Sequence, residues 1–296
     1  MTLSLSRPVF CLFVACCITA LPTLAQTAEL ARAKGTHQSL RQAKTEEDRL
    51  ALHQQLPGLW EAAMMAGGVM EATWDDWQEA VVVLGEGANQ LVVFTWNVEL
   101  TNRTQRYGGW IAQANPESAL GYDWALLEQG DSDHDAEENR MFRHDGWHGC
   151  LYFDGVLTTD RNQTVYTLLA WDGHDALTNR KWVESVEMRK GRAKFGIPNI
   201  SMPEGLRKRC VLTYGDAIQA AMRFEEQNSR IVMDHLAPQS PEFEGQKAFY
   251  GPTLSYDALV WHKGGWQWEG DVEVANPSDG SRRQYRDPTG RARRRN

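Results

Sequence analysis

Apolar and polar residues alternate along most of the chain after residue 74, in short runs separated by turns. Between residues 92 and 100, Phe94 and Trp96 fall on one side of an extended chain, while Thr95 and Asn97 fall on the other. This period of two predicts a half-buried β-strand. Similar runs predict further strands at residues 107–114, 122–129, 150–158, 165–171, 181–188, 209–214, 221–225, 230–235 and 258–262.

The predicted strands follow one another without long helices between them, and polar or glycine-containing turns separate several of them, as at residues 189–192 and 262–265. Such an order is typical of an antiparallel meander rather than an α/β sheet. Ten or more strands in one open sheet would leave long unpaired edges. We therefore predict a mainly β protein, with one antiparallel domain over residues 70–276 closed as a barrel or a sandwich, and a small β-propeller as the alternative.

One predicted strand, residues 165–171, is apolar on both faces. Leu168 points to one face and Leu169 to the other, and each has mainly apolar residues on its own side. This pattern predicts a central strand that is covered twice. Asp172 and Gly173 then end the strand in a tight turn.

Residues 27–66 predict helices instead, because leucines recur at helical spacings among polar residues and few side chains are β-branched. Pro57 and Gly58 are expected to break this region into two pieces. The β domain therefore has a predicted helical N-terminal extension.

Residues 1–25 predict a signal peptide. Arg7 supplies a positive charge, residues 9–21 form a short apolar run, and small residues precede a cleavage position after Ala25. The run is shorter than the roughly 20 residues of a transmembrane helix, and no second run of that length follows. We expect an exported, soluble protein, periplasmic or secreted, with no transmembrane segment in the mature chain.

The charge of the chain is unevenly distributed. The net charge is −8, yet residues 278–296 contain seven arginines against two aspartates, so the rest of the chain is more acidic than the total suggests. An acidic body excludes nucleic acid as its expected partner. The Arg-rich tail predicts a disordered, solvated end, and contact with an anionic surface or with the acidic body is the alternative.

Two cysteines, Cys150 and Cys210, remain once the signal peptide is removed. In an exported protein such a pair suggests one disulfide. Two buried free thiols are the alternative.

Three motifs carry a resemblance to a known family. They are the sequences YTLLAWDGHDALTNRK at residues 166–181, RIVMDHLAP at residues 230–238 and YGPTLSYDAL at residues 250–259. The chain resembles a family of uncharacterised secreted bacterial proteins over residues 70–276. The resemblance implies a signal peptide, a helical N-terminal region and a β-rich body, but no activity. Cys150 and Cys210 depart from the family's apolar residues, which fits a disulfide private to this protein.

Asp172, His174 and Asp175 follow the predicted central strand and are candidates for a metal or hydrolase site. Carboxylates and imidazole suit a transition metal when a distant side chain completes the shell, and Asp234 or His235 could supply it. The alternative is that Asp172 shapes a turn and His235 fills a core. No metal is assigned, and no cofactor is predicted.

Trp261, Trp266 and Trp268 flank a glycine-rich turn, with Trp266 and Trp268 on one face of a strand. Exposed indoles can stack on sugar rings or apolar ligands. Because the chain has no recognised catalytic motif, the leading hypothesis is a ligand- or carbohydrate-binding module of the envelope space. A hydrolase near Asp172 and His174, and a structural or interaction protein, are the alternatives. Nothing in the sequence predicts the oligomeric state.

Overall fold

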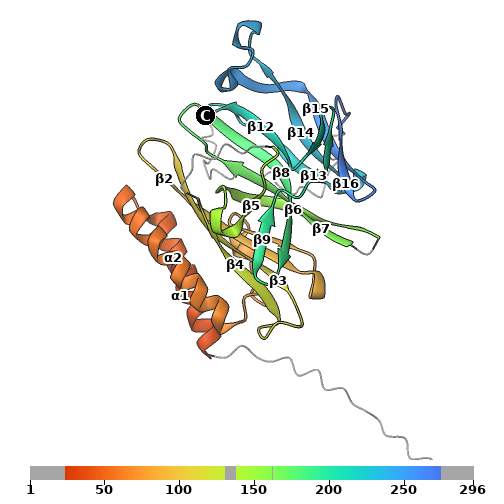
Figure 1. Cartoon of the computed structure of the whole chain (residues 1–296). Coiled ribbons are helices and arrows are strands. Elements are labelled where there is room, and N and C mark those ends of the chain that lie inside the picture. Colours follow the sequence, from red (N-terminus) through yellow and green to blue (C-terminus); the bar gives the residue numbers. More distant parts are fainter. Residues whose placement is uncertain (1–23, 131–137, 162, 275–296) are drawn as a thin grey trace, which may run out of the picture.

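The computed structural model describes residues 24–130, 138–161 and 163–274 (Figure 1). The predicted tail at residues 278–296 lies outside these ranges, as does all but the end of the predicted signal peptide. Two helices precede the strands, as predicted. Neither of these described helices combines the length and the apolarity needed to cross a membrane.

The helices form a hairpin of α1, Leu24–Gln42, and α2, Glu46–Ala66. The expected break at Pro57 is wrong, because α2 continues through it. The chain turns instead before Thr45, whose side chain accepts a hydrogen bond from the Asp48 backbone N–H at 3.1 Å and so caps α2. Proline removes one helical hydrogen bond, and the buried side chains of Leu56 and Trp60 on either side of it hold the helix on the sheet.

The strands form three sheets, which are mainly antiparallel. The first has the order β1-β2-β3-β4 and the second β5-β9-β8-β7-β6, with β12 also paired to β8. The third has the order β11-β10-β16-β15-β14-β13, in which β10 and β16 run parallel. The bounds are β1 Val81–Leu84, β2 Leu91–Glu99, β3 Gln105–Ala114, β4 Tyr122–Glu128, β5 Phe142–Arg143, β6 Leu151–Asp160, β7 Gln163–Asp172, β8 Thr178–Arg189, β9 Arg192–Phe195, β10 Ile200–Met202, β11 Gly205–Arg207, β12 Arg209–Gly215, β13 Met222–Glu225, β14 Arg230–Pro238, β15 Tyr250–His262 and β16 Gly265–Glu269. Short 3-10 helices lie at Asp75–Trp77, Gly87–Asn89, His144–Gly146, Glu226–Asn228, Pro241–Phe243 and Lys247–Phe249.

The helical hairpin covers one face of the first sheet (Figure 1). Trp60 of α2 packs against Phe94 of β2 at 4.6 Å between ring centroids, and Phe94 stacks on Trp110 of β3 at 5.6 Å. The opposite face of β2 is also covered, because Val93 and Thr95 are buried toward the second sheet. The prediction that this strand is half-buried is therefore wrong.

The second sheet lies between the first and the third. On one face of β7, the Tyr166 hydroxyl donates to the backbone oxygen of Asn89 at 3.0 Å, next to the first sheet. On the other face, Trp266 Nε1 of β16 donates to Thr167 Oγ1 at 3.0 Å. The prediction that residues 165–171 form a central strand covered twice is confirmed.

The mainly β, antiparallel fold with an N-terminal helical region is confirmed. Of the predicted closures, a sandwich fits, since no sheet in the described parts of the chain closes into a barrel. Side chains of both faces of the second sheet, such as Leu168 and Leu169, are fully buried. Stacking three sheets therefore buries sheet faces without barrel closure.

The predicted disulfide is wrong, because Cys150 and Cys210 are free thiols. Cys150 immediately precedes β6, whereas Cys210 lies in β12 and pairs with Val183 of β8. Strands β7 and β8 lie between them, which at the usual strand spacing puts the two cysteines about 14 Å apart. A disulfide requires Cα atoms within about 7 Å. Burial raises the pKa of both thiols, that of Cys210 to about 12, so both are protonated at neutral pH.

Candidate functional site

The polar residues predicted after the central strand lie together, but they are engaged with one another and with the fold. Asp172 Oδ1 accepts a hydrogen bond from the Tyr107 hydroxyl of β3 at 2.8 Å, and that hydroxyl accepts one from the Gly173 backbone N–H at 3.0 Å. Burial raises the pKa of Asp172, although the bond from Tyr107 opposes that rise. Asp172 therefore links the second sheet to the first.

His174 and Asp175 shape the loop between β7 and β8. Arg180 Nη2 lies 2.6 Å from His174 Nε2, and since a guanidinium can only donate, this ring nitrogen accepts. Asp175 Oδ1 accepts from the backbone N–H groups of Leu177 and Thr178 at 2.8 and 2.7 Å. The turn-forming role expected for Asp172 as an alternative thus belongs to Asp175.

Asp234 and His235 do not complete a metal site at this loop. Asp234 Oδ2 accepts from the Ala221 backbone N–H at 2.6 Å, and His235 Nδ1 lies 2.9 Å from Asp257 Oδ2 in the third sheet. Among the described residues, no group of three or more His, Cys, Asp or Glu side chains could hold a metal ion.

The predicted tryptophan platform faces the core. Trp266 and Trp268 share a face of β16, as expected, but Trp266 is fully buried and Trp268 packs partly buried against the same core. Trp261, opposite Trp266 on β15, contacts it at 5.0 Å between ring centroids. A buried indole cannot stack on a sugar ring, so Trp266 is not a platform residue.

A cavity of about 510 Å³ lies elsewhere, between the helical hairpin and an edge of the first sheet. We call it the hairpin cavity. Its size falls within the range of small-molecule sites. It is lined by His37, Leu40, Arg41, Ala43, Arg49, Glu79, Ala80, Thr95, Trp96, Asn97, Glu99, Leu100, Thr101, Arg103 and Leu151.

The cavity lies where strand β2 extends beyond the end of its neighbour β1. Strand β1 pairs with β2 only as far as Phe94, and the last bond across this edge runs from the Thr95 backbone N–H to the Ala80 oxygen at 2.8 Å. In an antiparallel pair, successive residues direct their backbone groups to alternate edges. The backbone groups of Asn97 and Glu99 therefore point to the same open edge as those of Thr95.

Arg49 of α2 reaches this edge. Its Nη2 donates to the Glu99 backbone oxygen at 3.2 Å, and its Nη1 donates to the Lys44 backbone oxygen at 3.4 Å. Its Nε is buried without a hydrogen-bond partner in the described parts of the chain. No ion pair within 4.0 Å joins this guanidinium to a carboxylate of a described residue.

The other two arginines of the cavity are paired with carboxylates. Arg41 Nη2 lies 2.5 Å from Glu79 Oε2. Arg103 Nε lies 3.1 Å from Glu99 Oε1, and its Nη2 lies 2.7 Å from Asp216 Oδ2. Arg49 is thus the arginine in this cavity that forms no ion pair with a carboxylate of a described residue.

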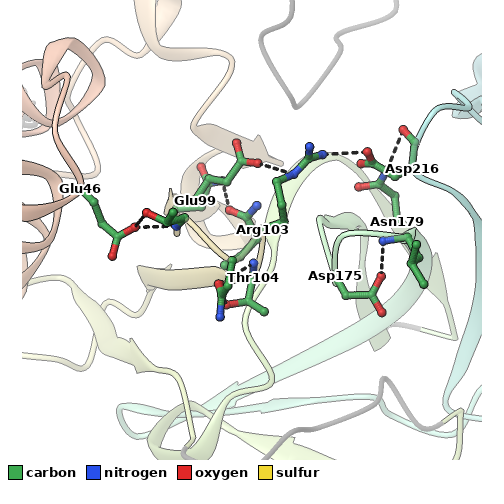
Figure 2. Close-up of polar contacts among 12 residues, drawn as sticks. Glu46, Glu99, Arg103, Thr104, Asp175, Asn179 and Asp216 are labelled. Atoms are coloured by element: carbon green, nitrogen blue, oxygen red, sulfur yellow. Dashed lines mark hydrogen bonds and ion pairs between the residues drawn. The ribbon is translucent and has the colours of Figure 1, made fainter.

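A polar network borders the cavity (Figure 2). Arg103 connects Glu99, at the end of β2, to Asp216, which also accepts from Asn179 Nδ2 at 3.1 Å. The backbone N–H of Asp216 donates to the Leu177 oxygen at 2.9 Å. The polar loop that the sequence singled out is therefore attached to the border of the cavity.

His37 of α1 supplies a buried imidazole in the cavity wall. It is 3% exposed, packs edge-on against Phe94 at 5.0 Å, and has an Nδ1 without a hydrogen-bond partner among the described residues. Burial, with the charge of Arg41, lowers the pKa of His37 to about 4. At neutral pH the imidazole is therefore uncharged and keeps one unused polar atom.

We expect His37 to make the protein less stable as the pH falls. An unfolded histidine has a pKa of about 6.5, so below this pH the unfolded chain binds a proton that the folded protein does not bind. This proton stabilises the unfolded state, and the effect grows until the pH reaches the folded-state pKa of His37, about 4. The full effect is about 3 kcal/mol. Urea unfolding of wild type and His37→Gln at pH 7 and pH 4.5 measures it. A difference between the two proteins that is the same at both pH values would contradict a buried, neutral His37.

A second, smaller cavity of about 300 Å³ lies between α2 and strands β3 and β4. Its wall includes His53, Arg106 and Gln129. His53 Nδ1 accepts a hydrogen bond from Trp96 Nε1 at 3.0 Å, which fixes the indole that also lines the hairpin cavity. The ring of Trp96 lies over Gly108, where a Cβ atom would come within 2.4 Å of it.

Sequence reasoning missed the hairpin cavity, because its residues come from α1, α2, β2 and the start of β6. The sequence signal was weak: His37 and Arg49 are single polar residues on helices, and such residues usually face solvent. The early end of β1 opposite a longer β2 was the only other cue, and strand lengths are poorly fixed by sequence.

Comparison with known proteins gives no match: no family model, no curated protein and no solved structure is similar to this chain. The resemblance to a family of secreted bacterial proteins stays a prediction. Functional inference therefore depends on the hairpin cavity and its chemistry.

Proposed function

We propose that this is an exported protein that binds a small molecule in the hairpin cavity. The observation that carries the proposal is a cavity of about 510 Å³ whose wall includes Arg49, which forms no ion pair with a carboxylate of a described residue, and the neutral imidazole of His37. Arg49 donates to two backbone oxygens through Nη1 and Nη2. A ligand could accept the guanidinium protons that these two bonds leave unused. Export is inferred from the predicted signal peptide.

Binding fits the cavity better than hydrolysis does. Its two carboxylates, Glu79 and Glu99, are each paired with an arginine. Its hydroxyl groups are also engaged, since Thr95 Oγ1 accepts from the Tyr152 backbone N–H at 3.0 Å and Thr101 Oγ1 donates to Glu46. A nucleophile would need a base within hydrogen-bond reach. The carboxylate that Thr101 contacts is a weakened base, because hydrogen bonds from the hydroxyl and the backbone N–H of Thr101 lower the pKa of Glu46.

Filling the cavity should remove binding. Ala43 lies in the cavity wall at the turn between the helices, so a tryptophan in its place would occupy ligand space. We expect Ala43→Trp to weaken binding of the uncharged probe phenylnaphthylamine at least tenfold, measured by fluorescence titration. Ala119→Trp, in an exposed turn, is the matched control and should bind like wild type. Equal binding of the probe by both variants would refute the proposal, and so would failure of wild type to bind both this probe and its anionic analogue anilinonaphthalene sulfonate.

A further inference from the structure

We infer that the occupant of the hairpin cavity is an apolar acid, a molecule with one anionic head group held at Arg49 and an apolar body. This inference deepens the proposed function and depends on it. The geometry that points to it is the position of one arginine without an adjacent carboxylate at the open edge of β2.

The guanidinium of Arg49 is available to an anion. Its two hydrogen bonds go to backbone oxygens at 3.2 and 3.4 Å, which are long for charge-assisted bonds. Hydrogen bonds from the hydroxyl and the backbone N–H of Thr101 lower the pKa of Glu46, and the charge of Arg49 adds a smaller lowering. A carboxylate or a similar oxyanion could accept the Nη1 and Nη2 protons that the two backbone bonds leave unused, and arginine binds such groups in a two-point geometry.

The open edge of β2 supplies a second kind of donor. The alternation along β2 directs the Asn97 backbone N–H to this edge, where β1 no longer provides an acceptor. A backbone N–H beside an arginine is a common way to hold an oxyanion. His37 in the same wall is neutral at pH 7, so it adds no second positive charge.

The cavity chemistry also limits the ligand to one anionic group. Arg41 and Arg103 already form ion pairs with Glu79 and Glu99. A ligand with several phosphates would be repelled by these carboxylates. The wall presents both polar and apolar surface, and its apolar part includes Leu40, Trp96, Leu100 and Leu151. These surfaces favour a hydrocarbon or aromatic body, because contact with them removes apolar area from water.

Two fluorescent probes that differ in charge test the inference. Anilinonaphthalene sulfonate carries a sulfonate on the aromatic skeleton that phenylnaphthylamine presents uncharged. Wild type should bind the sulfonate at least tenfold more tightly, because hydrogen bonds to a charged group are stronger than those between neutral groups. In Arg49→Met this preference should disappear, through weaker sulfonate binding with unchanged binding of the neutral probe. Unchanged neutral-probe binding also shows that the variant is folded.

Arg41→Met is the matched control, because Arg41 lines the same cavity but is paired with Glu79. It should keep most of the preference for the sulfonate. Arg49→Lys, which retains the charge without the planar fork, should keep part of it. Equal affinity of wild type for both probes, or equal losses in Arg41→Met and Arg49→Met, would overturn the apolar-acid inference while leaving the cavity itself intact. Failure of both probes to bind would refute the proposed function instead.

Discussion

Replacing Glu184 with alanine is expected to lower the free energy of unfolding by about 3–5 kcal/mol. Glu184 is fully buried on β8, where Oε2 lies 2.6 Å from Arg209 Nη2 and Oε1 accepts from the Tyr152 hydroxyl at 2.8 Å. Trp182 Nε1 donates to the same oxygen at 3.0 Å. Without the carboxylate, the charge of Arg209 stays buried without this counterion and two donors lose their acceptor. Urea unfolding followed by tryptophan fluorescence measures the loss.

A double-mutant cycle distinguishes the ion pair from packing. Arg209 is also fully buried, so Arg209→Met alone should cost several kcal/mol, because it leaves Glu184 charged and buried. Burial opposes ionisation of Glu184, but Arg209 and His148 outweigh it, so the pKa of Glu184 lies below its ordinary value. Glu184→Gln and Arg209→Met combined in one protein should cost much less than the sum of the costs of Glu184→Gln alone and Arg209→Met alone. Additive costs would contradict a coupled ion pair.

Replacing Trp60 with alanine is expected to cost about 3–5 kcal/mol and to loosen the helical hairpin from the first sheet. The Trp60 side chain is fully buried, with ring centroids 4.6 Å from Phe94 and 5.4 Å from Trp110. Because α1 and α2 form one wall of the hairpin cavity, phenylnaphthylamine binding should fall together with stability. Urea unfolding and probe titration of the same sample measure both.

Met65→Ala is the matched control for Trp60, since Met65 lies on the same helix and is 62% exposed. Its effect should stay within about 0.5 kcal/mol, as for most surface changes. Loss of stability without loss of probe binding in Trp60→Ala would show that the cavity does not depend on the position of the hairpin.

Much of the strand pattern could be predicted from the sequence, because burial of a strand follows a period of two. The run at residues 165–171 was identifiable as a central strand since its two faces are both apolar. Strand β2 was misjudged because Thr95 and Asn97 look like a solvent-facing side. In the structure, Thr95 is buried and its hydroxyl accepts a backbone N–H from the second sheet.

Other errors arose where tertiary contacts override local preference. Pro57 was expected to end a helix, yet its neighbours Leu56 and Trp60 bury enough apolar surface to carry α2 through it. The pairing of Cys150 with Cys210 followed from their number and the predicted compartment. Sequence gives no information on strand order, and the order β6-β7-β8-β12 keeps them apart.

The candidate site was the least predictable part. Asp172, His174 and Asp175 lie close together, as neighbours in a short loop do whatever the fold, but this proximity does not make them a site. The hairpin cavity instead joins His37 and Arg49 of the helices to the open edge of β2, and only the packing of the hairpin on the sheet brings these segments together.

A crystal structure of the protein with bound anilinonaphthalene sulfonate would test the central claim most directly. We expect the aromatic rings against Leu40, Leu100 and Leu151, and the sulfonate within hydrogen-bond distance of Arg49 and the Asn97 backbone N–H. A probe bound in the smaller cavity beside Arg106, or on the surface with the hairpin cavity empty, would contradict the account.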